Sequence, residues 1–343
     1  MPNEVLRECL ATLMRGENLS RGGATLLLDA LLDDSATDAQ IAAALIALKL
    51  KGETVNELAG LAEGMRARSV RVTTNHSCFI DTAGTGSSCV KTFNVSTAAA
   101  FVIAGAGLPV AKHGNRAASS RCGSADVLTA LGVNVSMSPE TSSKCLDEIG
   151  ICFMFAPLYH GATARVAGIR REMGVQTTFN LLGPLTNPAG APRQIIGVWD
   201  RSLIEPLAQT LSLLGTERAW IVHGGDGLDE ITVADKTFVA EASVGAVRAF
   251  EIEPQDFGLE RVALDGLGGG DAEANAAIIR GVLTGARRDA ARLLVVVNAA
   301  AALHVGGLAQ SLSDGAKMAE RSLDSGAAQG RLEALVQTSN EAG

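Results

Sequence analysis

Aromatic residues are scarce in this chain: Phe, Trp and Tyr together make up 3% of its 343 residues. An all-β sandwich relies on aromatic and β-branched residues, so this scarcity argues against that class. Ala and Gly are abundant instead, which suits closely packed helices joined by glycine turns. Because 47% of the residues are apolar, the chain can fill one large domain, or a large and a small one.

Positive charge is also in short supply, and the formal net charge is −8. A protein that coats nucleic acid needs clustered Lys and Arg, so this balance argues against a nucleic-acid partner. A small anionic substrate is compatible with it, because a local field is enough to hold such a ligand.

The sequence also lacks the patterns of secreted, membrane and metal-cluster proteins. Its six cysteines form no CxxC pair and no Cys/His metal spacing, so we expect unreactive thiols in a reducing compartment. The N-terminal stretch has no basic region followed by an apolar segment, which predicts no secretory signal. No run reaches the ~18 apolar residues that a membrane helix needs. We therefore expect a cytoplasmic protein without a membrane partner.

The beginning of the chain has the periodicity of helices. Apolar residues recur there every three or four positions. Thr37 with Gln40, and Thr54 with Glu57, match the capping-box pattern that begins a helix. We expect a small all-helical domain over residues 1–71.

From about residue 78 the pattern changes to short apolar runs that alternate with helix-like segments. The runs are short enough for strands and lie at residues 78–80, 108–111, 151–155, 194–199 and 219–222. This rhythm predicts an α/β domain with a mainly parallel central sheet over residues 72–343. Helices from about 165–190 are expected to pack on the small domain. In such sheets the ligand site lies where loops leave the carboxyl ends of the strands.

A loop rich in Gly, Ser and Thr follows the first predicted strand, over residues 81–97. Its glycines allow close approach of the backbone, and the helix expected to open at Ser96-Thr97 offers unpaired N–H groups. Such a loop suits a phosphate or a diphosphate. Taken alone, a tight turn followed by an ordinary helix cap explains it more often.

A basic loop follows the second predicted strand. Lys112 and Arg116 can offset anionic charge, and Asn115 can orient a polar ligand. Three hydroxyls in the loop can donate to oxyanions: Ser119, Ser120 and Ser124. The alternative is a solvated basic loop.

Two further segments carry candidate ligands. Asp229 and Glu230 follow a strand and a glycine turn, and adjacent carboxylates suit Mg²⁺, which prefers carboxylate, substrate and water oxygens. A lone pair of this kind is more often a solvated turn, but beside two anion-binding loops the metal site is favoured. Arg170 can hold a carboxylate in a bidentate pair, although taken singly it is more often a surface residue.

These motifs, in this order, resemble the anthranilate phosphoribosyltransferase family. The residues that carry the resemblance are Gly84-Thr85-Gly86, Thr92-Phe93-Asn94-Val95-Ser96-Thr97, Lys112-His113-Gly114-Asn115-Arg116, Gly123-Ser124-Ala125-Asp126 and Phe179-Asn180-Leu181-Leu182-Gly183-Pro184-Leu185. The likeness extends over nearly the whole chain. It implies transfer of the phosphoribosyl group of 5-phosphoribosyl 1-diphosphate to anthranilate, in tryptophan biosynthesis. It also implies an active site between the two domains, two Mg²⁺ ions and a homodimer formed through the helical domain.

The resemblance further implies a role for each matching residue. The residues expected to bind phosphoribosyl diphosphate are Gly84, Ser87, Ser88, Thr92, Asn94, Val95, Ser96, Thr97, Lys112, His113, Gly114, Asn115, Arg116, Ala117, Ala118, Ser119, Ser120 and Ser124. Those expected to bind anthranilate are Gly84, Asn115 and Arg170, and those expected to serve magnesium are Ser96, Asp229 and Glu230. Lys112 and the two carboxylates would act electrostatically. No acid or base is expected, because the amine of anthranilate is already neutral at pH 7, and His113 is assigned a positioning role.

The glycine loop departs from the family pattern. The family usually has Gly-Thr-Gly-Gly-Asp-Gly, whereas residues 84–89 are Gly-Thr-Gly-Ser-Ser-Cys. Ser87 and Ser88 can still donate to a diphosphate, but a Cβ atom restricts the backbone wherever φ must be positive. The change bears on diphosphate affinity more than on the reaction.

Two other functions compete with the transferase. A pyrimidine-nucleoside phosphorylase has a related architecture, but phosphorolysis needs no magnesium, so the Asp229-Glu230 pair and the His113-Gly114-Asn115 motif favour the transferase. A non-catalytic relative that binds nucleic acid would need a basic surface. The charge of −8 and the retained carboxylates argue against it.

Overall fold

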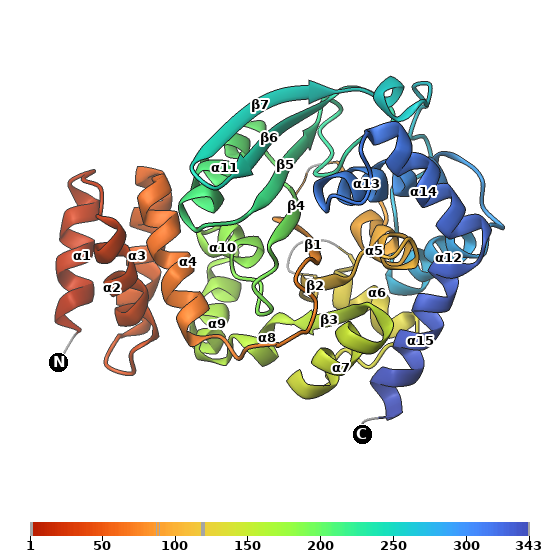
Figure 1. The fold of residues 1–343 in the computed structure, drawn as a ribbon. Helices are drawn as coiled ribbons and strands as arrows, with labels where there is room; N and C mark the ends of the chain where they lie inside the picture. The colour runs from red at the N-terminus through yellow and green to blue at the C-terminus, as the bar shows by residue number, and fades with distance from the viewer. Residues whose placement is uncertain (1–2, 87, 89, 118–120, 342–343) are drawn as a thin grey trace.

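The computed structural model describes residues 3–86, 88, 90–117 and 121–341. A helical bundle lies at one end of the molecule, with the N-terminus, and an α/β unit makes up the rest (Figure 1). The bundle consists of α1 (Glu4–Met14), α2 (Arg21–Leu32), α3 (Asp38–Lys51) and α4 (Val55–Arg68). The two predicted capping boxes are confirmed: the side chains of Thr37 and Thr54 cap α3 and α4, and Gln40 and Glu57 reach back.

The described residues form one seven-stranded sheet in the order β3-β2-β1-β4-β5-β6-β7. Its strands are β1 (Ile80–Gly84), β2 (Val110–Gly114), β3 (Ile151–Phe155), β4 (Arg193–Gly197), β5 (Arg218–Gly224), β6 (Thr237–Ser243) and β7 (Ala246–Ile252). The neighbours from β3 to β5 pair in parallel, and β6 and β7 pair antiparallel at one edge. The mainly parallel sheet is therefore confirmed, while β6 and β7 were not predicted.

Helices cover both faces of the sheet. They are α5 (Val95–Gly105), α6 (Ser124–Ala130), α7 (Pro139–Ile149), α8 (Ala156–Tyr159), α9 (Ala164–Met173), α10 (Phe179–Leu185), α11 (Ile204–Leu213), α12 (Ala272–Leu283), α13 (Ala290–Val305), α14 (Leu312–Asp324) and α15 (Ala327–Glu341). Short 3₁₀ turns occupy Gly161–Thr163, Arg201–Leu203 and Pro254–Phe257. Within the described part of the chain, no helix combines the length and the apolar character needed to cross a membrane.

Two hydrophobic cores lie on opposite faces of the sheet. Alternate strand residues serve each: Ile195 and Trp220 pack with the core around α5 and α13, while Ile196 and Ile221 pack with the other. This alternation follows from the period of two in a strand. The second core also contains the apolar residues of α1–α4 and of α9–α11, so the bundle and part of the larger unit share one core.

The winding of the sheet reverses at β1. The chain runs from β1 to β2 and β3 on one side, then returns to place β4 on the other side, with Gly84 opposite Gly197 in register. A reversal of this kind leaves a crevice outside the carboxyl ends of the strands, which is where ligands bind in open α/β sheets.

Candidate active site

A cleft of about 360 Å³ opens at this reversal, where β1, β2 and β5 end. The predicted ligand residues that line it are Gly84, Ser88, Thr92, Asn94, Ser96, Thr97, Lys112, His113, Gly114, Asn115, Arg116, Ala117, Ser124, Arg170, Asp229 and Glu230. Val95 does not line it, because its side chain is buried in the core in the first turn of α5. Four other predicted residues, Ser87, Ala118, Ser119 and Ser120, lie outside the described residues.

Lys112 occupies the floor of the cleft and is 4% exposed. Its Nζ donates to the Thr82 carbonyl and lies 3.4 Å from Ser96 Oγ. Burial lowers the pKa of Lys112, and the nearby carboxylates of Asp81 and Glu230 oppose that shift. A buried ammonium so close to a hydroxyl and a carboxylate is a fixed positive charge for an anionic ligand.

Glu230 faces Lys112 from the acidic loop between β5 and β6. Its Oε1 accepts a hydrogen bond from the Ser96 N–H at 3.3 Å, in the first turn of α5. Burial and the adjacent Asp229 raise the pKa of Glu230 to about 8, while Lys112 opposes them. Burial also raises the pKa of Asp229. Two neighbouring half-buried carboxylates of this kind are destabilised as anions unless a cation joins them.

The donor set fits a magnesium ion. Carboxylates and a hydroxyl are hard oxygen ligands, and Mg²⁺ takes one or two carboxylates and completes its shell with substrate oxygens and water. Ser96, Asp229 and Glu230 supply such oxygens at one wall of the cleft. The described residues contain no group of three or more His, Cys, Asp or Glu side chains that could hold a metal without a substrate.

The start of α5 presents polar groups that lack partners. The hydroxyl oxygens of Thr92 and Thr97 are buried and make no hydrogen bond. Both residues line the cleft beside the N-terminus of α5, where N–H groups and the helix dipole favour an anion. Buried polar atoms are almost always paired, so the two hydroxyls point to a ligand with acceptor oxygens.

In the glycine loop, the structure shows the role of Ser88, which replaces the residue usual in the family pattern. Gly86 has φ of +62°, a conformation that glycine adopts without strain. Ser88 is buried, and its Oγ donates to the Gly227 carbonyl at 3.0 Å. Its single proton is therefore used to tie the glycine loop to the acidic loop, whereas the sequence led us to expect a donor to diphosphate.

The acidic loop is fixed to β4 by close contact. A Cβ atom at Gly197 would lie 1.7 Å from the Asp229 carbonyl oxygen, so no side chain fits there. The Asp229 backbone, in the loop after β5, therefore lies directly against Gly197 at the carboxyl end of β4.

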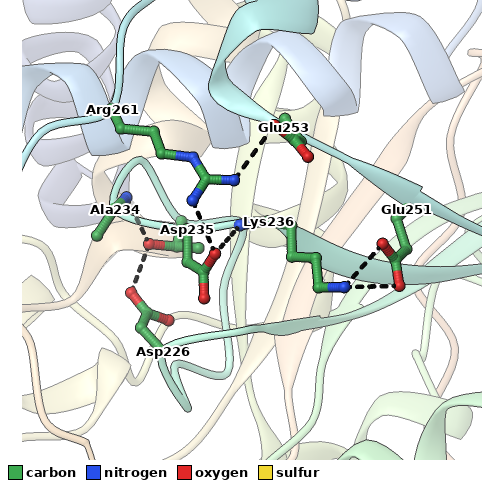
Figure 2. Close-up of polar contacts among 8 residues, drawn as sticks. Asp226, Ala234, Asp235, Lys236, Glu251, Glu253 and Arg261 are labelled. Carbon is green, nitrogen blue, oxygen red and sulfur yellow. Dashed lines mark hydrogen bonds and ion pairs between the residues drawn. The ribbon is translucent and has the colours of Figure 1, made fainter.

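A polar network outside the cleft braces the same loop (Figure 2). Thr232 Oγ1 donates to Asp226 at 2.5 Å and accepts the Ala234 N–H at 3.0 Å. Arg261 lies 3.2 Å from both Asp235 and Glu253, which ties the end of the loop to the segment after β7. These contacts leave the loop little freedom around Asp229 and Glu230.

Arg170 reaches the cleft from α9. Its guanidinium donates to Asn180 Oδ1 at 3.0 Å and stacks over the Phe179 ring at 5.4 Å. The Arg170 Nε is buried and has no partner, and burial lowers the pKa of this side chain. An arginine whose guanidinium stacks on a ring and keeps an N–H donor without a partner is suited to binding a carboxylate.

His113 lines the cleft and is neutral. Its Nδ1 donates to the Gly183 carbonyl at 3.1 Å, and its backbone N–H donates to Asp81. Burial lowers the pKa of His113 to about 3 and that of the neighbouring His160 to about 4, with ring centroids 5.2 Å apart. A group with so low a pKa is a poor proton acceptor at neutral pH.

The sequence did not single out several residues that build the site. Asn180 and Phe179 hold Arg170, and Asn187 holds Asp81 at 2.7 Å. Asn275 donates to the Asn94 side chain at 3.0 Å. The first two lie in a motif that the sequence did mark, but their roles depend on which side chains tertiary packing brings together.

The comparisons with known proteins agree with this geometry. Residues 7–69 match the helical bundle domain of a glycosyl transferase family, and residues 76–329 match its a/b domain. Fold and cleft thus define a two-domain glycosyl transferase. Proteins named anthranilate phosphoribosyltransferase from Moorella thermoacetica and Rubrobacter xylanophilus are each 51% identical to this chain, over 97% and 98% of it and 98% of each relative.

Solved structures give the same result. The crystal structure of anthranilate phosphoribosyltransferase from Thermus thermophilus superposes with a TM-score of 0.91 at 39% identity, covering 97% of this chain and 99% of that one. The enzyme from Saccharomyces cerevisiae in complex with PRPP and Mg gives 0.89 at 28% identity, covering 98% of both chains. This chain belongs to the anthranilate phosphoribosyltransferase family, and neither the phosphorylase nor the nucleic-acid-binding alternative is favoured.

Proposed function

We propose that this protein transfers the phosphoribosyl group of 5-phosphoribosyl 1-diphosphate to the amine of anthranilate, releasing diphosphate, in tryptophan biosynthesis. The observation that carries the proposal is the meeting of Lys112, Ser96 and Glu230 in one cleft from three separate segments. The similar yeast enzyme was solved with PRPP and Mg, and also with 4-fluoroanthranilate.

The diphosphate side of the cleft lies between α5 and the basic loop. Lys112 offers charge, and Thr92 and Thr97 offer free hydroxyls. Ser96, Asp229 and Glu230 would hold Mg²⁺, and we place two ions there; magnesium supplies charge stabilisation to the departing diphosphate. These groups are fixed before the substrate arrives, so they stabilise charge as it develops on the leaving group.

The acceptor side lies toward α9 and α10. Arg170 would pair with the carboxylate of anthranilate, with Asn115 and Gly84 at the edge of the same pocket. The nitrogen of anthranilate is neutral at pH 7 and needs no base. The low pKa of His113 agrees with a positioning role, in which it holds the turn at Gly183.

The protein is proposed to work as a cytoplasmic homodimer. Met14 and Leu50 are 76% and 82% exposed at the C-terminal ends of α1 and α3, which pack against each other. Large exposed apolar side chains that gather at one place mark an interaction surface. A second copy of the bundle would cover them.

The decisive experiment mixes the protein with anthranilate, phosphoribosyl diphosphate and Mg²⁺. We expect anthranilate fluorescence to fall as diphosphate is released. No turnover over a wide range of magnesium and substrate concentrations would refute the function. Release of free base from thymidine and phosphate would instead support a phosphorylase.

The metal site has its own test. Asp229→Asn combined with Glu230→Gln removes both negative charges while keeping the shapes of the side chains. We expect turnover that depends on Mg²⁺ to be lost. Unchanged magnesium dependence would show that the ions bind elsewhere.

A further inference from the structure

Asn298, on α13, holds the backbone of the residue next to Glu230. Its Oδ1 accepts the Ile231 N–H at 3.0 Å, and its Nδ2 donates to the Ile231 carbonyl at 2.8 Å. The same Nδ2 donates to the Leu294 carbonyl at 2.8 Å, one turn earlier in α13. Asn298 is 4% exposed, so all three bonds form away from water.

The helix that carries Asn298 is a rigid support. Most residues of α13 are buried, and it packs against α5 and α14. α5 supplies the Ser96 N–H that Glu230 accepts. The side chain of Glu230 and the backbone that follows it are therefore fixed to two helices of one packed layer.

The opposite side of the loop is held separately. Thr232 donates to Asp226, and the Asp229 carbonyl packs against Gly197. Ile231 lies between these anchors, and Asn298 alone among the described side chains bonds to both of its backbone groups. Without that amide, the N–H and C=O of Ile231 would be buried without partners and the peptide would turn to find them.

We propose that Asn298 is a positioning residue that aims the Glu230 carboxylate at the divalent cation. The inference rests on the proposed function, because it takes Glu230 to be a magnesium ligand. Asn298 touches neither cation nor substrate; it acts through the Ile231 peptide. Groups that orient metal ligands typically change metal affinity by roughly 10–100-fold when they are replaced.

Two variants test the proposal. Asn298→Asp keeps the shape and the acceptor for Ile231 but sets a carboxylate against two carbonyls. Asn298→Ser is milder, because a helical serine bonds to the carbonyl four residues earlier, here Leu294, and loses only the bonds to Ile231. Mn²⁺ binding in the presence of inorganic diphosphate, followed by the spin resonance of free Mn²⁺, gives a readout that does not depend on turnover.

We expect both variants to bind Mn²⁺ roughly 10–100-fold more weakly and to need correspondingly more Mg²⁺ for half-maximal turnover, with the anthranilate KM unchanged. Asn134→Ala is the matched control. Asn134 also uses its amide to hold backbone, that of Ser339 and Ser136, in a part of the chain that does not line the cleft. It should lower the melting temperature and leave Mn²⁺ binding unchanged.

The proposal is overturned if Asn298→Ser melts lower, as Asn134→Ala does, yet binds Mn²⁺ like the unmodified protein. Asn298 would then be structural only. If the unmodified protein itself binds no Mn²⁺ with diphosphate and turns over without Mg²⁺, the metal site fails first, and the inference fails with it. Mn²⁺ binding by the unmodified protein therefore distinguishes failure of the proposed metal site from failure of the role assigned to Asn298.

Discussion

Arg170 illustrates how a single side chain is prepared for a ligand. Asn180 and the Phe179 ring hold the guanidinium, and its buried Nε is left without a partner. In the sequence, only the family resemblance distinguished Arg170 from its neighbour Arg171, because local periodicity treats two adjacent arginines after Ile169 alike. The structure distinguishes them directly, since Arg171 is exposed and Arg170 lines the cleft.

We expect Arg170→Ala to raise the KM for anthranilate far more than the KM for phosphoribosyl diphosphate. Loss of a hydrogen bond to a charged group costs about 1.5–3 kcal/mol, which is roughly 10–100-fold in KM. Steady-state kinetics with each substrate varied in turn would measure it. Arg171→Ala, one residue along α9, should change neither value, and equal effects of Arg170→Ala on both substrates would contradict the assignment.

The two buried histidines make stability depend on pH. The pKa of His113 is lowered to about 3 and that of His160 to about 4, from an ordinary 6.5. At a pH between the folded and the unfolded pKa of each histidine, the unfolded chain binds more protons than the folded one. The stabilisation is therefore complete above pH 6.5 and is lost as the pH falls toward 4.

Replacing both histidines by Asn should flatten this dependence. Below pH 6.5, each histidine lowers the free energy of unfolding by about 1.4 kcal/mol per pH unit. The reason is that the unfolded chain binds one more proton at that residue than the folded chain does. Urea unfolding at pH 6.5 and pH 5 would measure the difference, and Asn can keep the donor to the Gly183 carbonyl. An unchanged slope in the double variant would show that other groups govern acid unfolding.

At the scale of elements, the close contact between β4 and the acidic loop sets the position of the proposed metal ligands Asp229 and Glu230. We expect Gly197→Ala to displace Asp229, because the added Cβ atom would lie 1.7 Å from its carbonyl oxygen. The variant should lose Mn²⁺ binding and melt at a lower temperature.

Gly22→Ala is the control, since nothing lies within 4 Å of a Cβ atom there and alanine favours the helix by about 1 kcal/mol. It should leave Mn²⁺ binding alone and raise the melting temperature slightly. If Gly197→Ala gave the same Mn²⁺ binding and melting temperature as Gly22→Ala, the contact between Gly197 and Asp229 would not constrain the loop.

The elements also show why sequence patterns found five strands and missed two. Central parallel strands are buried on both faces and form continuous apolar runs. β7 is an exposed edge strand, most of whose side chains face solvent, and it follows β6 through a short turn at Val244-Gly245, where Gly245 has φ of +73°. Hairpins of this kind alternate in polarity, which is a weaker signal than a continuous apolar run.

The first strand was predicted too early for a related reason. It runs to Gly84 and includes the polar residues Asp81 and Thr82. Asp81 accepts hydrogen bonds from the His113 N–H and from Asn187, so a buried network replaces apolar contacts along the strand. Local hydrophobicity carries no information about such partners.

At the scale of the whole molecule, the order of motifs along the chain was more informative than any one motif. Ser96 and Glu230 are 134 positions apart, and the rule that ligands gather at the carboxyl ends of parallel strands was enough to place them together. Asn298 and Asn275 could not be found in the same way, because they lie within helices and act on loops from behind.

Dimerisation is also tested at this scale. We expect the protein to sediment as a dimer, and Met14→Glu with Leu50→Glu to give monomers, because charge at the contact would be buried without a partner. Val244→Glu is the control, since Val244 is also exposed but lies in the turn between β6 and β7. A monomer before any substitution would rule out this interface.

The shared core described above has a further consequence for how the polypeptide can be divided. Apolar side chains of α9, α10 and α11 complete the interior that α1–α4 begin, although more than ninety positions of chain separate α4 from α9. A protease that nicked the connection near residues 69–76 would therefore leave two pieces still clasped together. Neither piece would be expected to stay folded once the other was removed. The boundary between the two domains along the sequence is therefore not a boundary between two independently stable units.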